Sequence, residues 1–286
     1  MIAQIMKYIL EPAWYALKGN SGWMTWNLFL ALVPLALAFW LFRKPRSPVL
    51  LWGTLLLLGA TLLPHLKRVL VYASYIFRGN AAIYIVGVFC VTLVLMYLDF
   101  RLFQNRSGNN PRHRFLRWWL GFFAFIAFLP NAPYVLTDII HLYDDIRMDY
   151  SVWVLTLAVV PQYLLFMFLG FEAYTLSLIY MGDYMKAQNW GKFIWQTELI
   201  VHGLSALGIF LGRFRRFNSW DIVTNPDIVV TGVMNDLTAK GPLLVMVVTF
   251  IVIASWYWFS KKVTLAIAQQ HHKSDRLESL ATDSRL

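Results

Sequence analysis

The segment FLPNAPYVLTDIIH, residues 128–141, places two prolines, an amide, a carboxylate and an imidazole at the end of a long apolar run. Pro130 and Pro133 lack amide hydrogens, and each disfavours helical geometry in the residue before it. In lipid, backbone groups without a helical partner are tolerated only where protein or a water-filled cavity receives them. The segment therefore predicts a membrane-spanning helix that is broken at Pro130 and Pro133.

The polar side chains of this segment fall on one face. If helical geometry largely persists, Asn131, Tyr134, Asp138 and His141 stand at i, i+3, i+7 and i+10. Asp138 and His141 are acceptable ligands for zinc or another divalent ion, or an acid and base pair, and Asn131 and Tyr134 are candidate binding residues. Two ligands do not complete a catalytic zinc site, which needs three protein groups. The alternative is that Asp138 caps or pairs locally while His141 lies at headgroup level.

The composition is that of a polytopic membrane protein. The 286 residues are 59% hydrophobic and only 14% charged, whereas about a quarter of the residues in a soluble domain are charged. We therefore predict an all-α, polytopic transmembrane helix bundle. Its expected parts are an interfacial N-terminal segment (residues 1–21), a single transmembrane helical domain (22–260) and a polar cytoplasmic tail (261–286). Cys90, the only cysteine, provides neither a disulfide framework nor a cysteine cluster for metal.

Seven apolar runs reach or approach the length of about twenty residues that crosses a bilayer. The second and the sixth are the shortest, and the fourth carries the two prolines. The runs are residues 22–42, 49–64, 81–98, 118–137, 152–180, 199–212 and 243–259.

Basic residues between these runs indicate the orientation. They follow the first run, the third run and the last run, and these three places lie on one side if seven spans are right. By the positive-inside rule that side is cytoplasmic, so we expect the N-terminus outside and the C-terminus in the cytoplasm. Helical spans indicate an inner (cytoplasmic) membrane, because outer-membrane proteins are barrels. The net charge of +10 is thus an orientation signal for a protein in a lipid bilayer, and no nucleic-acid surface is expected.

Three arginines, Arg213, Arg215 and Arg216, stand at the outer end of the sixth run. One interpretation is that they pair with the acidic outer loop or with phospholipid phosphates, both of which suit arginine. The other is that Arg213 and Arg216, with Asn218, hold an anionic lipid or envelope substrate beside Asp138 and His141. Asp221, further along, is a candidate general base or a cap of a surface turn.

These motifs together resemble a bacterial family of integral membrane proteins known as domain of unknown function 1361. The resemblance is carried by residues 128–141, by GIFLGRF (208–214), by RFNSWD (216–221) and by WNLFLALVP (26–34). It covers most of the chain from the first run to the last. It implies membership of the family and no activity or cofactor, since none is established for the family.

Ionisable residues also occur deeper in the runs. Glu172 lies inside the longest run, and Glu198 and His202 stand at i and i+4. Such groups are costly in lipid unless they are paired, and by default they mark a functional hypothesis. Glu172, Glu198 and His202 form either a proton-binding or metal site on the inner side or a hydrogen-bonded clamp between helices.

Two functions remain. The first is a non-catalytic permease, sensor or assembly protein with a polar site on its outer face. The alternative is a membrane-embedded, possibly metal-dependent, hydrolase or transferase acting on a lipid-linked or envelope substrate, with Asp138 and His141 at its centre. The non-catalytic class is favoured because neither half of the chain completes a recognisable catalytic set.

Overall fold

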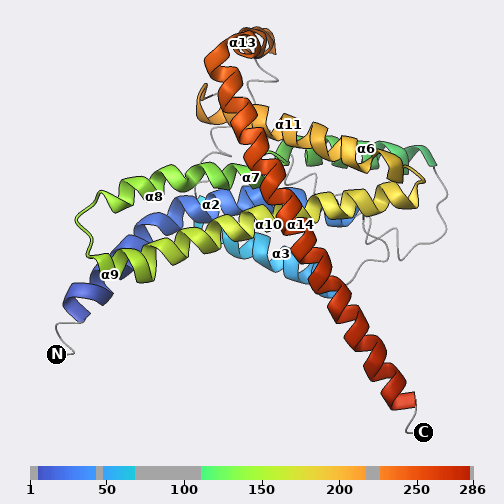
Figure 1. Ribbon diagram of the computed structural model, residues 1–286, viewed down its shortest axis with the longest axis horizontal. Helices are drawn as coiled ribbons and strands as arrows, with labels where there is room; N and C mark the ends of the chain where they lie inside the picture. Colours follow the sequence, from blue (N-terminus) through green and yellow to red (C-terminus); the bar gives the residue numbers. More distant parts are fainter. Residues whose placement is uncertain (1–5, 43–47, 68–110, 217–225, 284–286) are drawn as a thin grey trace.

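The computed structural model describes residues 6–42, 48–67, 111–216 and 226–283. Within these ranges the chain is helical and contains no strand. The predicted all-α class is therefore confirmed for the part of the chain that the structure describes. Figure 1 shows the helices as one bundle, crossed by a long C-terminal helix.

Two long helices form the centre of the bundle. Helix α2 (Glu11–Phe42) follows the short π-helix η1 (Met6–Leu10), and α10 (Val160–Ala187) lies along it (Figure 1). Gln162 donates to the Leu17 carbonyl at 3.0 Å near one end, and the rings of Phe39 and Tyr180 lie 6.3 Å apart near the other. The two helices therefore run parallel over most of their length.

A chain of shorter helices covers α2 in the antiparallel direction. It consists of α6 (Pro111–Phe128), α7 (Asn131–Tyr134), the 3-10 helix η3 (Val135–Asp138) and α8 (Ile139–Ile146). The rings of Phe42 and Phe125 pack 5.2 Å apart at the end of α2. A second antiparallel neighbour of α2 is α3 (Pro48–Leu62), which continues into η2 (Leu63–His65).

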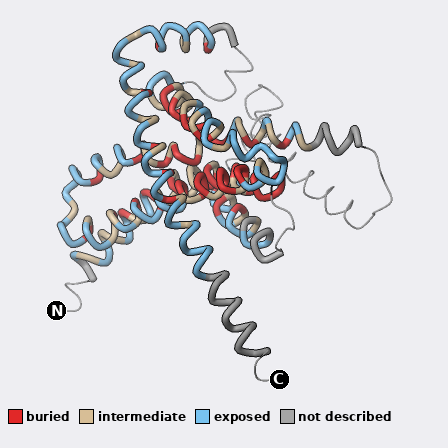
Figure 2. Tube along the Cα trace, turned by 45° about the vertical axis from the view of Figure 1, so that its right-hand side comes forward, coloured by how far each residue is buried: buried red, intermediate tan, exposed pale blue. Residues whose placement is uncertain are grey.

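The remaining elements complete the far side of the bundle. The chain enters α10 through α9 (Val152–Val154) and η4 (Leu155–Val159), and it leaves through η5 (Gly191–Phe193) into α11 (Ile194–Arg213). Helix α13 (Pro226–Thr238) leads to α14 (Lys240–Asp283), which crosses α10 and α11 and projects away from the bundle (Figure 1). In Figure 2 the buried residues gather in the centre, where α2 and α10 meet, while most of α14 up to residue 270 is exposed.

Five helices of the described residues are long and apolar enough to cross a membrane: Tyr8–Phe42, Trp118–Ile146, Val152–Ala187, Gly191–Arg213 and Lys240–Gln270. Each of them contains one of the seven predicted runs. The second predicted run corresponds to a shorter apolar helix, Leu55–His65, and the third lies outside the described residues. Large apolar side chains such as Trp153, Leu164 and Ile251 are more than half exposed, as expected where lipid covers a helix. These helices are those of a multi-pass membrane protein.

Two predicted segment boundaries fall inside continuous helices. Helix α2 runs without interruption across residues 21 and 22, where the interfacial segment was expected to meet the first span. Helix α14 likewise continues through Lys261 to Asp283, beyond the expected start of the polar tail. Figure 1 shows the C-terminal part of α14 leaving the bundle as a single helix.

Candidate functional site

The proline segment keeps a helical path with altered hydrogen bonding. Helix α6 ends at Phe128, and the Leu129 carbonyl, which Pro133 cannot engage, accepts from the Ala132 amide at 3.2 Å. The Tyr134 amide then donates to the Pro130 carbonyl at 3.2 Å. The segment continues through the tighter turns of η3. The Ala132 amide thus satisfies the Leu129 carbonyl, which Pro133 leaves without its usual partner.

Asp138 lies at the end of η3 and is almost fully buried, with 1% of its surface exposed. Its Oδ2 accepts from Asn27 Nδ2 of α2 at 2.8 Å, and its Oδ1 accepts from Arg213 Nη2 of α11 at 3.1 Å. A buried charge is tolerated when it is paired and its remaining lone pairs are hydrogen-bonded. The Asp138 carboxylate therefore joins three segments that are far apart in sequence. We call Asn27, Tyr134, Asp138 and Arg213 the Asp138 cluster.

Arg213 is the last residue of α11, and its guanidinium makes several contacts besides the one with Asp138. Its Nη2 also donates to the Thr137 carbonyl at 2.6 Å, and its Nη1 donates to the Tyr134 hydroxyl at 3.4 Å. The guanidinium carbon lies 5.3 Å from the centre of the Tyr134 ring, within the range of a cation–π contact. Only 22% of the arginine side chain is exposed. Most of its hydrogen-bonding capacity is therefore directed at the protein itself.

Gly208 lets α11 approach the proline segment closely, and Gly212 lies within ordinary contact distance of it. A Cβ atom on Gly208 would lie 3.1 Å from Pro130 Cβ, and one on Gly212 would lie 3.7 Å from a ring carbon of Tyr134. Gly208 and Gly212, which are spaced as a GxxxG pair, therefore pack inside the bundle. This packing places Arg213, the next residue, beside Asp138.

The other two residues of the predicted polar face make different contacts. Asn131 Nδ2 donates to the Phe128 carbonyl at 3.1 Å, which satisfies a backbone group at the end of α6. The His141 ring lies 4.8 Å from the Trp23 ring of α2. Of the four residues predicted to share a face, the structure brings Tyr134 and Asp138 together with Arg213.

A second polar group lies one to two turns further along α8. Asp145 Oδ2 accepts from Asn20 Nδ2 at 2.6 Å and from the Tyr163 hydroxyl at 3.1 Å. Asp145 is buried, although its sequence neighbours Asp144 and Asp149 made the stretch resemble an exposed acidic loop. These bonds tie α8 to α2 and α10.

Glu172, Glu198 and His202 all have polar partners. Glu198 accepts from Tyr257 at 2.7 Å and from Lys261. Glu172 accepts from two hydroxyls of α14, and His202 Nδ1 lies 2.7 Å from the Tyr174 hydroxyl. Within the described residues, no group of three or more His, Cys, Asp or Glu side chains could hold a metal ion. The metal candidates Asp138, His141, Glu172 and His202 are therefore not assembled into one site in this part of the chain.

The arginines after Arg213 divide between a paired and an exposed position. Arg215 forms a two-point ion pair with Asp236 of α13, and this hydrogen bond and charge raise the pKa of the Arg215 guanidinium. Arg216 is exposed and has a positive φ of 56°. Asn218 and Asp221 lie outside the described residues, so their predicted roles stay predictions.

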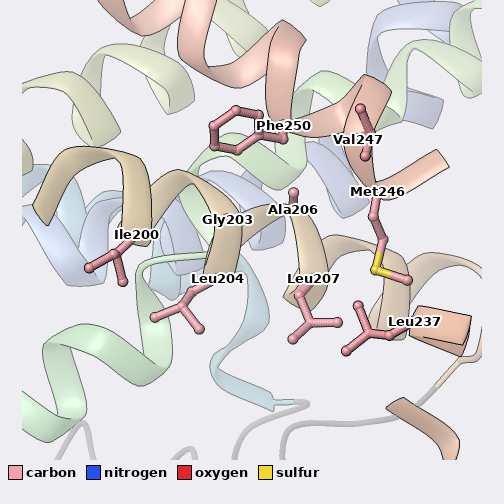
Figure 3. Close-up of a pocket in the computed structure, with 9 residues that line it drawn as sticks. All are labelled: Ile200, Gly203, Leu204, Ala206, Leu207, Leu237, Met246, Val247 and Phe250. Atoms are coloured by element: carbon pink, nitrogen blue, oxygen red, sulfur yellow. The ribbon is translucent and has the colours of Figure 1, made fainter. Parts of the chain in front are cut away.

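An apolar pocket of about 370 Å³ lies on the far side of α11. Figure 3 shows side chains of α11 and α14, with Leu237 of α13, around it. None of its nine lining residues carries a polar side chain, and none belongs to the Asp138 cluster. The pocket therefore offers no group for chemistry.

Sequence comparison places these residues in a family. Residues 88–255, more than half of the chain, match the family described as "Protein of unknown function (DUF1361)". The chain belongs to this family. The DUF1361 match includes Asp138, Glu172 and Arg213. It leaves out Asn27, which donates to Asp138, and Lys261, which donates to Glu198. No curated protein and no solved structure matches the chain.

Proposed function

We propose that this protein is a non-catalytic membrane protein of the permease, sensor or assembly class, in which the Asp138 cluster fixes the arrangement of the helices at the outer face. The observation that carries the proposal is the state of the Asp138 carboxylate. It is 1% exposed, and both of its oxygens accept hydrogen bonds from the protein. This is the geometry of a contact that joins helices.

A catalytic role for Asp138 would require a different set of contacts around its carboxylate. A general base must come within hydrogen-bond reach of the proton that it removes, and a metal ligand must present a free lone pair. Asp138 already directs its oxygens at Asn27 and Arg213, and the Arg213 guanidinium is occupied by Thr137 and Tyr134. The alternative function, a metal-dependent hydrolase or transferase acting on a lipid-linked or envelope substrate, would require these contacts to open.

The placement in the membrane is part of the proposal. The proposed arrangement has seven spans, the fourth broken at Pro130 and Pro133, with the N-terminus outside and the C-terminus in the cytoplasm, in the inner membrane. The distribution of basic residues supports this orientation. Arg213, which pairs with Asp138, is the last residue of α11, and Glu198, which pairs with Lys261, lies near its beginning. This supports assigning the Asp138 cluster and Glu198 to different faces. A topology reporter fused after Asp149 should be active outside, and one fused after Gln188 should be active in the cytoplasm.

The test of the function compares His141→Ala and Asp138→Asn with the unchanged protein, purified in detergent. Metal content and a melting curve are recorded for each. We expect no stoichiometric transition metal in any of them, a lower melting temperature for Asp138→Asn, and little change for His141→Ala. Stoichiometric zinc that disappears in a His141→Ala protein of unchanged stability would overturn the proposal in favour of the enzyme.

A further inference from the structure

Two carboxylates from different helices bind the same stretch of α14. Glu198 of α11 contacts Tyr257 and Lys261, and Glu172 of α10 contacts Ser260 and Thr264. These four residues of α14 are spaced by three or four positions, so they lie along one side of the helix. Helix α14 is thus fastened to the bundle by two acids that stand side by side along its surface.

The charges of this contact do not balance. Lys261 Nζ is bound to Glu198, whose side chain is 10% exposed, and the two form an ion pair. Among the described residues, no ion pair involves Glu172. The lysine therefore neutralises Glu198 and not Glu172.

Glu172 receives hydroxyl groups in place of a cation. Ser260 Oγ lies 2.6 Å from its Oε2, and Thr264 Oγ1 lies 2.6 Å from its Oε1. Both distances are in the range of charge-assisted O–H···O⁻ bonds from a hydroxyl to a carboxylate. Hydroxyls can donate or accept, so they can satisfy the carboxyl group in either protonation state.

The surroundings of Glu172 disfavour a permanent negative charge. It lies within the apolar span Val152–Ala187, and Phe168 and Leu169, one turn away, are exposed on the lipid-facing surface. An acidic residue inside a span is costly when no cation neutralises it. A proton is the smallest charge that can do so at a site already lined by two hydroxyls.

We propose that Glu172 is a proton-binding site at the crossing of α10 and α14. A proton taken from water attaches to one carboxyl oxygen, and the hydroxyl that donated to this oxygen then accepts from it. Its release to water restores the two donated bonds, so no other group is consumed. The charged and titratable groups near the site on the packed helices include Lys261 and Tyr257 of α14, Glu198 and His202 of α11, and Tyr174 of α10. Glu198 accepts from Tyr257 and Lys261, while His202 and Tyr174 contact each other and the Tyr257 ring. Such a site fits a permease or a sensor better than an assembly protein.

The experiment uses a hydrophobic carbodiimide, dicyclohexylcarbodiimide, on the full-length protein in lipid nanodiscs. The carboxylic acid proton goes to a carbodiimide nitrogen as the carboxyl oxygen bonds to the central carbon, and rearrangement leaves a stable N-acylurea that retains the whole reagent. Peptide mass spectrometry locates the adduct. We expect one adduct at Glu172, with a rate that falls as the pH rises and that is equal in sodium and potassium chloride.

Two variants and a spectroscopic measurement make the test decisive. Glu172→Gln should lose the adduct, whereas Glu198→Gln should keep it, because the adduct forms on the Glu172 carboxyl group. Infrared difference spectra between low and high pH should show a protonated carboxyl band that is absent only in Glu172→Gln. The proposal is overturned if neither the band nor the adduct depends on Glu172, or if sodium ions at constant pH protect Glu172 from labelling.

Discussion

Arg213 Nη2 lies 3.1 Å from Asp138 Oδ1, although 75 positions separate the two residues in sequence. The contact joins the end of α11 to the proline segment, and Asn27 joins the same carboxylate to α2. Each residue is the other's charge partner inside the bundle. Removing one of them therefore has a different consequence from removing both.

The first prediction concerns this pair. Arg213→Met leaves the Asp138 carboxylate buried without its cation, and breaking such a pair costs about 3 kcal/mol or more. Asp138→Asn keeps an acceptor for Arg213 and removes the charge, so its cost should be smaller, about 1–2 kcal/mol. Melting of the purified variants in one detergent measures the order. The double variant should lose less than the sum of the two single losses. Strict additivity would mean that the pair does not interact.

The second prediction concerns close helix approach. A Cβ atom on Gly170 would lie 2.7 and 2.8 Å from the two methyl groups of Val135, whereas one on Gly203 would meet nothing within 4 Å. Gly170→Ala should therefore destabilise the bundle by about 1–3 kcal/mol through overpacking. Gly203→Ala is the matched control and should be neutral or slightly stabilising, because alanine favours helix.

A double variant distinguishes this clash from any other destabilising effect of alanine in α10. Combining Gly170→Ala with Val135→Ala removes both methyl groups that the new Cβ atom would meet. The melting temperature of the double variant should lie close to that of Val135→Ala alone, because Gly170→Ala should cost little once the two methyl groups are gone. If the double variant loses as much stability as the two single variants together, the close approach of η3 and α10 is not the cause of the Gly170→Ala destabilisation.

The third prediction tests the buried Asp145. Tyr163→Phe removes one of the two donors to its carboxylate and should cost about 1–3 kcal/mol, as expected for a hydrogen bond to a buried charge. Tyr143→Phe is the control, since Tyr143 is 56% exposed and its ring contact with Arg147 survives. Equal melting temperatures for the two variants would argue against a stabilising role of the Tyr163 bond.

The sequence predicted those features of the fold that depend on local chemistry. Long apolar runs identify membrane helices wherever they occur, and the polar side chains of the proline segment identified Asp138 and Tyr134 as special. The GxxxG spacing of Gly208 and Gly212 before Arg213 is likewise typical of close helix packing, and both glycines face the proline segment. These signals are readable because each depends on residues within a few turns of one another.

The partners could not be predicted, because they depend on which helices meet. Asn27 lies in an unremarkable apolar helix, and only the antiparallel packing of α2 against η3 turns its amide toward Asp138. Asp236 was not recognised as the partner of Arg215 for the same reason. Asp145 looked like a surface acid, and its burial depends on Asn20 and Tyr163 from two other helices.

Two neighbouring lysines of α14 provide the last prediction. Lys261 reaches Glu198 across the helix interface, whereas Lys262 is exposed and lies 3.5 Å from the centre of the Trp258 ring on its own helix. Lys261→Met should therefore leave Glu198 with Tyr257 as its remaining donor and should cost about 1–3 kcal/mol. Lys262→Met removes the same charge from the same helix and should cost well under 1 kcal/mol, since exposed charges contribute little.

Adding Glu198→Gln to Lys261→Met should recover part of the loss, because the glutamine leaves no uncompensated charge between α11 and α14. The measurement is again a melting curve in one detergent, run for all four proteins. If Lys261→Met and Lys262→Met melt alike, then Lys261 does not hold α14 on the bundle, and the ion pair has no part in fastening that helix. If only Lys261→Met lowers the melting temperature, and Glu198→Gln restores part of it, then the ion pair of Lys261 with the Glu198 carboxylate stabilises the contact between α11 and α14.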